Sequence, residues 1–211
     1  MTEPVDMLAD FPGWVTGFEP TFRREQSRAA GGVTYVKDLG PALWTLTAQS
    51  RVMTPNQLDH WRARLGALEG GMTRFRGYSM SRRYPIAYPH RTWPTLSQFN
   101  GVAELYAVAP SRKAIRISGL PAGFRFSVGD LIQIGNTDLH RVIETSHAAQ
   151  DGVTPAFEIY PHVWPGIEAA QQVAVNVLQP SCVMMLEPGS VSSEAAMSGW
   201  GSVSFRAIEA R

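Results

Sequence analysis

The sequence predicts a mainly β protein in which one α-helix packs on a β-sandwich and a small β-barrel is inserted into the same chain. Three observations lead to this expectation. Helix signals agree with one another in one stretch, residues 54–71. Short apolar segments separated by turn residues recur between residues 109 and 177. The segments 43–48 and 202–208, on either side of that region, each place three apolar side chains on one face.

The helix has a start signal, an apolar stripe and a stop signal, and we expect it over about residues 54–69. Thr54 and Gln57 form a Thr-x-x-Gln capping box, and Pro55 suits the first helical position. Gly70 and Gly71 end the helix. Between these ends, apolar residues recur every three or four positions, at Leu58, Trp61, Leu65 and Leu68. We expect this stripe to be buried against a sheet.

Length and composition exclude several classes of protein. With 211 residues, of which 44% are hydrophobic, the chain can bury a substantial core. A formal net charge of +1 gives no overall attraction to nucleic acid or anionic lipid. The single cysteine, Cys182, cannot form an intrachain disulfide, and its apolar neighbours favour a buried thiol in a reducing compartment. Without a signal peptide or an apolar run of about 18 residues, we expect a soluble protein made in the cytoplasm.

The first fifty residues contain three different kinds of segment. Residues 11–22 mix aromatic side chains with proline and glycine, a composition typical of an arm or an edge strand. Residues 23–32 are polar and end at two glycines, so we expect a turn or a mobile loop there, followed by a short strand at 33–36. Residues 43–48 alternate strictly, with Trp44 on the apolar side, and form a strand that leads into the helix.

After the helix we expect a strand over residues 72–80 and then a long ordered loop, because Tyr-Pro and Trp-Pro pairs occur between residues 82 and 94. Five short strands between residues 109 and 177 predict a small barrel. The strands at 183–186 and 202–208 rejoin the first unit. The predicted domains are therefore residues 1–108 together with 178–211, and residues 109–177 as the inserted barrel.

The search for a catalytic or metal site is mostly negative. Ser79 lies in a Gly-x-Ser-x-Ser sequence that lacks the closing glycine of a nucleophile elbow. The five histidines do not occur at metal-ligand spacings, and no glycine loop carries the Lys-Ser/Thr pair of a phosphate site. Asp130 and Asp138 fall in predicted turns, where carboxylates bond local backbone. We expect neither an enzyme nor a bound metal or cofactor.

Arginines interleaved with aromatic residues between 74 and 93 form the strongest local pattern. Such a composition can stack on single-stranded nucleic acid, can pack a loop, or can form a protein interface. Because the chain is nearly neutral, we favour the interface and expect no specific binding of nucleic acid. The candidate contacts to a neighbouring subunit are Phe11, Trp14, Phe18, Arg74, Arg76, Arg82, Arg83, Tyr84, Tyr88 and Trp93.

The order of several short motifs resembles the distal tail or minor tail proteins of long-tailed bacteriophages and their prophages. The resemblance covers most of the chain. It rests on Gln26-Ser27 before Gly31-Gly32, the tryptophan strand 42–47, the helix with Arg74-Phe75 after it, the segment 128–135 followed by His140-Arg141-Val142, and the closing strand 203–210. The hairpin that usually precedes the tryptophan strand in this family is expected to be reduced here.

The resemblance implies a tail-tube-like β-sandwich and a structural role in the virion tail. Proteins of this family form a ring, commonly a hexamer, with the tail tube protein on one side and a hub or baseplate protein on the other. The same resemblance implies no catalysis, no cofactor and no membrane contact. In such a ring, the aromatic arm, the proline-rich loop at 82–94 and the glycine-serine loop at 189–201 are suited to reach neighbours.

Two other functions remain open at this point. A carbohydrate-binding tail module could contact the host surface through the barrel, with Trp93, Tyr160 and Trp164 as sugar platforms. A hydrolase of the cell wall is a further possibility, although no set of residues in the sequence supports it.

Overall fold

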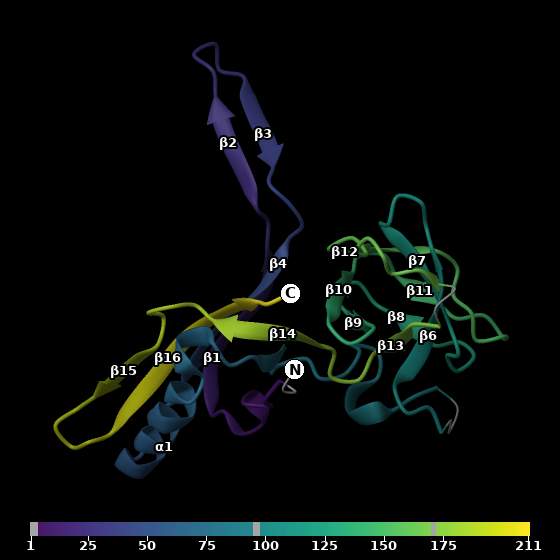
Figure 1. The fold of residues 1–211 in the computed structure, drawn as a ribbon. Coiled ribbons are helices and arrows are strands. Elements are labelled where there is room, and N and C mark those ends of the chain that lie inside the picture. Colours follow the sequence, from purple (N-terminus) through teal and green to yellow (C-terminus); the bar gives the residue numbers. More distant parts are fainter. Residues whose placement is uncertain (1–3, 95–97, 170–171) are drawn as a thin grey trace. The chain divides into compact units, whose positions relative to one another are not determined.

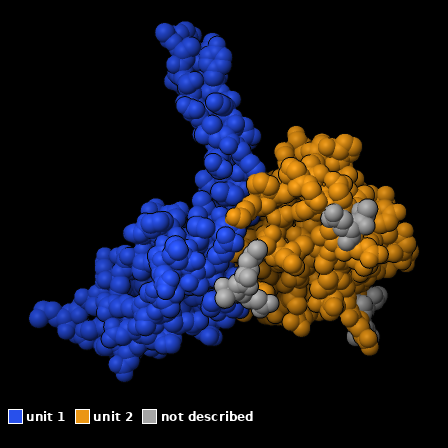
Figure 2. Space-filling view, viewed as in Figure 1, with its two compact units in different colours: residues 1–75, 184–210 blue, residues 76–183, 211 orange. Residues whose placement is uncertain are grey.

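The computed structural model describes residues 4–94, 98–169 and 172–211, and the protein is mainly β, as the sequence predicts. One α-helix and a closed six-stranded barrel lie among these residues, which confirms the predicted fold class. The chain divides into two compact units (Figure 2). Unit 1 comprises residues 1–75 and 184–210, and unit 2 comprises residues 76–183 and 211. Each unit is described by itself.

Unit 1 is built on a six-stranded sheet (Figure 1). Its strands are β1 (Gly13–Thr21), β4 (Leu43–Ser50), β16 (Gly201–Glu209), β14 (Ser181–Leu186) and β5 (Phe75–Tyr78), in that order, and β15 (Ser192–Ala195) pairs with β16. Alternation decides which face is inside. Trp44, Leu46 and Ala48 of β4 are buried, as are Val203, Phe205 and Ala207 of β16. The chain thus returns after the barrel to complete the sheet, as expected.

Helix α1 (Pro55–Gly66) is the second layer over this sheet and begins at the predicted position. The backbone N–H of Thr54 donates to Oε1 of Gln57 at 3.2 Å, which is one half of the capping box. A short 3₁₀ turn, η2 (Glu69–Gly71), follows the helix. All four residues of the apolar stripe, Leu58, Trp61, Leu65 and Leu68, are buried. Gly71 needs to be glycine, because its φ is +111° and an added Cβ would lie 2.6 Å from the carbonyl oxygen of Leu186.

Two of the four aromatic residues of the N-terminal stretch, Phe11 and Phe18, pack within unit 1, while Trp14 and Phe22 are exposed. Phe11, just after the 3₁₀ turn η1 (Leu8–Asp10), meets the rings of Trp61 and Phe205 edge-on at 5.1 and 5.3 Å. Phe18 stacks on Trp44 at 4.9 Å between ring centres. Residues 13–21 form the edge strand β1, paired with β4. The edge-strand alternative is therefore correct and the free arm is not, because these aromatic rings gain more by covering the sheet than by facing water.

Unit 2 contains the barrel. Strands β6 (Val102–Val108), β7 (Ala114–Ser118), β9 (Leu131–Ile134), β10 (Asp138–Val142), β12 (Phe157–Tyr160) and β13 (Ala174–Asn176) close in the order β10-β12-β7-β6-β13-β9. A separate pair is formed by β8 (Arg125–Phe126) and β11 (Ser146–His147). The β9–β10 hairpin turns at Gly135 and Asn136, as the sequence predicts. Leu105, Ile117, Phe126 and Phe157 belong to the apolar core of this unit.

The unit boundaries differ from the predicted domains. The barrel does not begin at residue 109, because β6 pairs with both β7 and β13 and is needed to close it. A five-stranded set without β6 would leave two unpaired edges. The proline-rich loop at 82–94, which contains the 3₁₀ turn η3 (Pro89–Arg91), also belongs to unit 2 and not to the sheet unit.

Candidate functional site

A two-stranded hairpin extends from the sheet of unit 1 (Figure 1). Strands β2 (Arg24–Arg28) and β3 (Thr34–Asp38) pair with Arg24 opposite Asp38 and Ser27 opposite Tyr35. Every residue of both strands is exposed. The exposed set includes apolar side chains: Tyr35 is 61% and Val36 is 60% exposed. The space-filling view shows the hairpin standing clear of the body of unit 1 (Figure 2).

The hairpin lacks the support that a two-stranded sheet normally needs. An isolated two-stranded hairpin is at best marginally stable in water, and its unpaired edges are templates for pairing with another chain. Among the described residues, β2 and β3 pair only with each other. Its apolar side chains would gain free energy by leaving water against another surface. The hairpin is therefore the strongest candidate for an assembly surface.

Sequence reasoning was partly wrong about this segment, because a turn or mobile loop was expected over all of 23–32 and the hairpin was expected to be reduced. The turn at Gly31-Gly32 is present, but residues 24–28 form a strand that pairs along its full length with β3. The residues of β2 are all polar and show no alternation, because neither face of the hairpin is buried by its own chain. The sequence feature that could have indicated the hairpin is the pair Gly31-Gly32, which lies in its turn. Gly32 has φ of +83°, and the turn is closed by hydrogen bonds from Ala29 N to Val33 O and from Gly32 N to Ala29 O, each 2.9 Å.

The two edges of the unit 1 sheet differ. The β5 edge is partly covered, because Val5 forms a parallel bridge with Phe75 and its N–H donates to the carbonyl of Arg74 at 3.1 Å. At the other edge, β1 pairs with β4 alone within the described ranges. Trp14, which is 77% exposed, and Val15 lie at the start of this strand. The β1 edge is a second candidate assembly surface.

The ten predicted contact residues separate into two groups. Trp14, Arg74, Arg76, Arg82 and Arg83 are exposed, and Tyr84 is half-buried. The remaining four do not face outward. Phe11 and Phe18 are buried in unit 1, Tyr88 is buried in unit 2, and Trp93 packs partly buried against the core of unit 2.

Tyr88 and Trp93 are corrections to the predicted interface. The two rings lie 5.8 Å apart, and each packs against Phe124, at 4.7 and 5.8 Å. The hydroxyl of Tyr88 accepts a hydrogen bond from the backbone N–H of Arg125 at 2.7 Å. Composition alone does not distinguish an aromatic residue at an interface from one in a core. Tyrosine and tryptophan suit both environments, because each has a large apolar ring and one polar group that can form a hydrogen bond. Here the proline-rich loop folds its rings onto the barrel and leaves its arginines outside.

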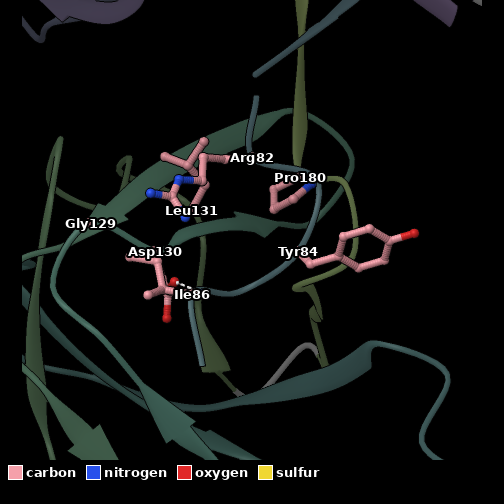
Figure 3. A pocket seen from close by; sticks show the side chains of 7 residues that line it. All are labelled: Arg82, Tyr84, Ile86, Gly129, Asp130, Leu131 and Pro180. Atoms are coloured by element: carbon pink, nitrogen blue, oxygen red, sulfur yellow. Dashed lines mark hydrogen bonds between the residues drawn. The ribbon is translucent and has the colours of Figure 1, made fainter. Parts of the chain in front are cut away.

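Asp130 holds this loop against the barrel (Figure 3). Its Oδ1 accepts from the backbone N–H of Ile86 and its Oδ2 from that of Ser127, both at 2.7 Å. Burial raises the pKa of the carboxyl, although these hydrogen bonds and the nearby Arg82 and Arg125 act in the opposite direction. Arg82, Tyr84, Ile86, Gly129, Asp130, Leu131 and Pro180 line a hollow at this place, the Arg82 hollow. The ring of Tyr84 points away from the Asp130 carboxylate.

We expect Asp130→Ala to loosen the loop. The substitution removes an acceptor shared by two backbone donors, so the free energy of unfolding should fall by about 1 to 3 kcal/mol. Amide hydrogen exchange should accelerate at Ile86 and Ser127 in particular. Asp151→Ala is the matched control, because this aspartate is exposed and accepts from a nearby backbone donor, Val153 N–H, at 3.0 Å. Unchanged exchange at Ile86 would mean that the carboxylate does not hold the loop.

The proposed sugar platforms are half-buried by packing within unit 2. The guanidinium of Arg211 lies 3.7 Å from the ring centre of Trp164 and covers one face of it. Trp93 packs with Phe99 and Phe124, and Tyr160 is half-buried in β12. A sugar needs an exposed aromatic face, and the aromatic rings chosen from the sequence are used for packing instead.

The remaining candidates for chemistry lack partners of the required kind. Ser79 Oγ lies 3.2 Å from Ser81 Oγ, a contact between two hydroxyls without a base. In the part of the chain that the structure describes, no group of three or more histidine, cysteine, aspartate or glutamate side chains could hold a metal ion. No helix in the same part is both long and apolar enough to span a membrane.

No family model matches the chain, and no curated protein matches it.

Proposed function

We propose that this protein is a structural component of a phage tail tip, in which copies form a ring that joins the tail tube to the baseplate or hub. The observation that carries the proposal is the β2–β3 hairpin, whose strands are wholly exposed and carry Tyr35 and Val36 into solvent. A surface of this kind is costly in a protein that works alone and is expected in a subunit that works in an assembly.

The sheet supports the same proposal. A closed ring is a heterologous assembly, so each subunit presents two different surfaces that complement each other. Unit 1 offers two unlike surfaces, the hairpin and the β1 edge, and its other edge is partly covered by Val5. The order of the motifs that resemble distal tail proteins supports the identity of the ring. The proposed neighbours are the tail tube protein on one side of the ring and a hub or baseplate protein on the other. The proposed location is the virion tail.

Tyr35→Asp combined with Val36→Asp should prevent assembly without unfolding the subunit. Both side chains are exposed, so the free energy of unfolding should change by less than about 0.5 kcal/mol per substitution. Two buried carboxylates at an interface would cost far more than the apolar contact they replace. The measurement is incorporation into tail particles in a host that supplies only the variant protein, together with light scattering of the purified chain.

Met72→Asp is the matched control, because Met72 is 82% exposed in unit 1 and lies outside the hairpin and β1. It should enter particles as the wild type does. Density for a closed ring in images of intact tails would support the proposal directly. Absence of the wild-type protein from purified tails would overturn it, whereas a monomer in dilute solution would not, since such rings can require a template.

A further inference from the structure

The charges of this nearly neutral chain are unevenly divided between its units. Unit 2 has ten Lys and Arg against seven Asp and Glu, whereas unit 1 has nine against eleven. The division is sharper in two segments. Residues 70–103 contain five arginines and no acidic residue, and residues 187–205 contain two glutamates and no basic residue. Glu187 forms a salt bridge with Arg206 at 3.4 Å, so Glu194 is the carboxylate of this segment that can complement the basic segment of another copy.

The basic segment supplies Arg82, Tyr84 and Ile86 to the lining of the Arg82 hollow. Arg82 and Arg83 are exposed and form no salt bridge within the described residues. The one carboxylate of the hollow, Asp130, is buried and already accepts two backbone hydrogen bonds. Beside the arginines, Ile86 is 41% exposed and Tyr84 half-buried. Arg82, with Arg83 and Arg125 near it, thus outnumbers the single carboxylate of the hollow, and the partly exposed Ile86 and Tyr84 lie beside it.

The acidic segment contains a second hairpin, which we call the 192–201 finger. It is formed by β15, the turn after it and the start of β16. Met197 is fully exposed and Trp200 is 50% exposed. Glu194 is exposed and makes no salt bridge among the described residues. Its chemistry, a carboxylate beside large apolar side chains, is the counterpart of that in the hollow.

The turn of the finger is well ordered by its own contacts. The N–H of Ala196 donates to Trp200 O and the N–H of Gly199 to Ala196 O, both at 2.8 Å. Met53 and Gly201 exchange two further backbone hydrogen bonds. Gly199 has φ of +80°, and an added Cβ would lie 2.8 Å from Cγ of Pro55 at the start of α1. An ordered turn loses little conformational freedom on binding, which favours a role as a docking element.

We propose that the 192–201 finger of one copy docks on the Arg82 hollow of a second copy, with Met197 against Ile86 and Tyr84 and with Glu194 paired to Arg82. This inference rests on one part of the proposed function, namely that copies of this chain assemble with one another. The contact is heterologous, because the finger belongs to unit 1 of one copy and the hollow to unit 2 of the other. It would give successive subunits of a ring a fixed direction.

Disulfide trapping tests the contact by position. Copies with Met197→Cys are mixed with copies with Ile86→Cys under mild oxidation, and a cross-linked pair is expected since docking brings the two positions together. The native Cys182 is only 2% exposed and should not compete. Met72→Cys replaces Met197→Cys as the control for random collision. Arg82→Glu in the second copy should lower the yield at least about tenfold, and Glu194→Arg in the first copy should restore it.

A yield no higher than that of the control, or one unaffected by Arg82→Glu, would overturn the inference. The proposed function would survive that result if the protein is found in purified tails and the hairpin variant is excluded from them. Conversely, a specific cross-link in a protein that is absent from tails would leave the contact in place and remove the tail function. Binding of a single-stranded oligonucleotide is a further outcome. If the oligonucleotide bound the wild type but not the Arg82→Glu variant, and no cross-link formed between copies, the hollow would be a nucleic-acid site instead.

Discussion

Trp61→Ala is expected to lower the free energy of unfolding by about 3 to 5 kcal/mol, the cost of truncating a large buried aromatic residue. The indole is 5% exposed and belongs to the buried stripe of α1. Phe11 meets it edge-on, and the guanidinium of Arg64 lies 4.7 Å from its ring centre. Alanine would leave a cavity between these groups that the helix and sheet cannot close without moving.

Urea unfolding of the purified chain measures this loss, with the slope of the transition checked so that a change in cooperativity is not taken for a change in stability. Trp14→Ala is the matched control, because the same residue type is 77% exposed in β1. The control should change stability by less than about 0.5 kcal/mol. If both tryptophan variants unfolded at the wild-type urea concentration, the packing of α1 described above would be incorrect.

Acidification from pH 6.5 to pH 4 is expected to destabilise unit 2 by up to about 3 kcal/mol through His140. The ring is fully buried in β10, and its Nδ1 lies 2.7 Å from the carbonyl oxygen of Pro161, so Nδ1 carries the proton and donates it. Nε2 is buried without a hydrogen-bond partner among the described residues. The pKa of His140 is lowered from 6.5 to about 4, mainly by burial and in smaller part by the nearby Arg211 and His162, while the hydrogen bond to Pro161 acts in the opposite direction.

The sign follows from proton uptake. Between pH 6.5 and pH 4 the unfolded chain binds a proton at His140 and the folded chain does not, so acid favours unfolding. Asp130 and Asp138 act oppositely at the acidic end, because burial raises the pKa of each carboxyl in the folded state. The contribution of His140 is therefore obtained by comparing the pH dependence of the free energy of unfolding in the wild type with that in a His140 variant. His140→Asn should flatten the dependence of stability on pH over this range, and His147→Asn, at an exposed position of β11, should leave it unchanged.

Helix α1 could be predicted from the sequence because all of its signals are local. Thr54, Pro55 and Gln57 set its start, and the stripe from Leu58 to Leu68 is buried as a helix on a sheet requires. The strands β4 and β16 were predictable for the same reason, since one buried face produces strict alternation. The closed barrel followed from short strands and turn residues, although β6 was assigned to the wrong side of the boundary.

The candidate site was less predictable because it depends on surfaces that the chain does not bury. The hairpin has no buried face, so its β2 strand shows no period of two and resembles a loop. Tyr88 was mistaken for an interface residue because its hydroxyl and ring suit a barrel core as well. Arg82 and Arg83 are exposed, as adjacent guanidinium groups usually are, and their predicted contact with a neighbouring subunit stays a prediction.

The place at which the barrel enters the chain has a consequence for how this protein can vary. Unit 2 leaves the sheet after β5 and returns in β14, and these two strands are neighbours in the sheet. The order β1-β4-β16-β14-β5 therefore does not depend on what the chain does between them. The barrel is thus inserted between two neighbouring strands, so a change in its size or sequence leaves the connectivity of the sheet, the helix and the exposed hairpin as it is.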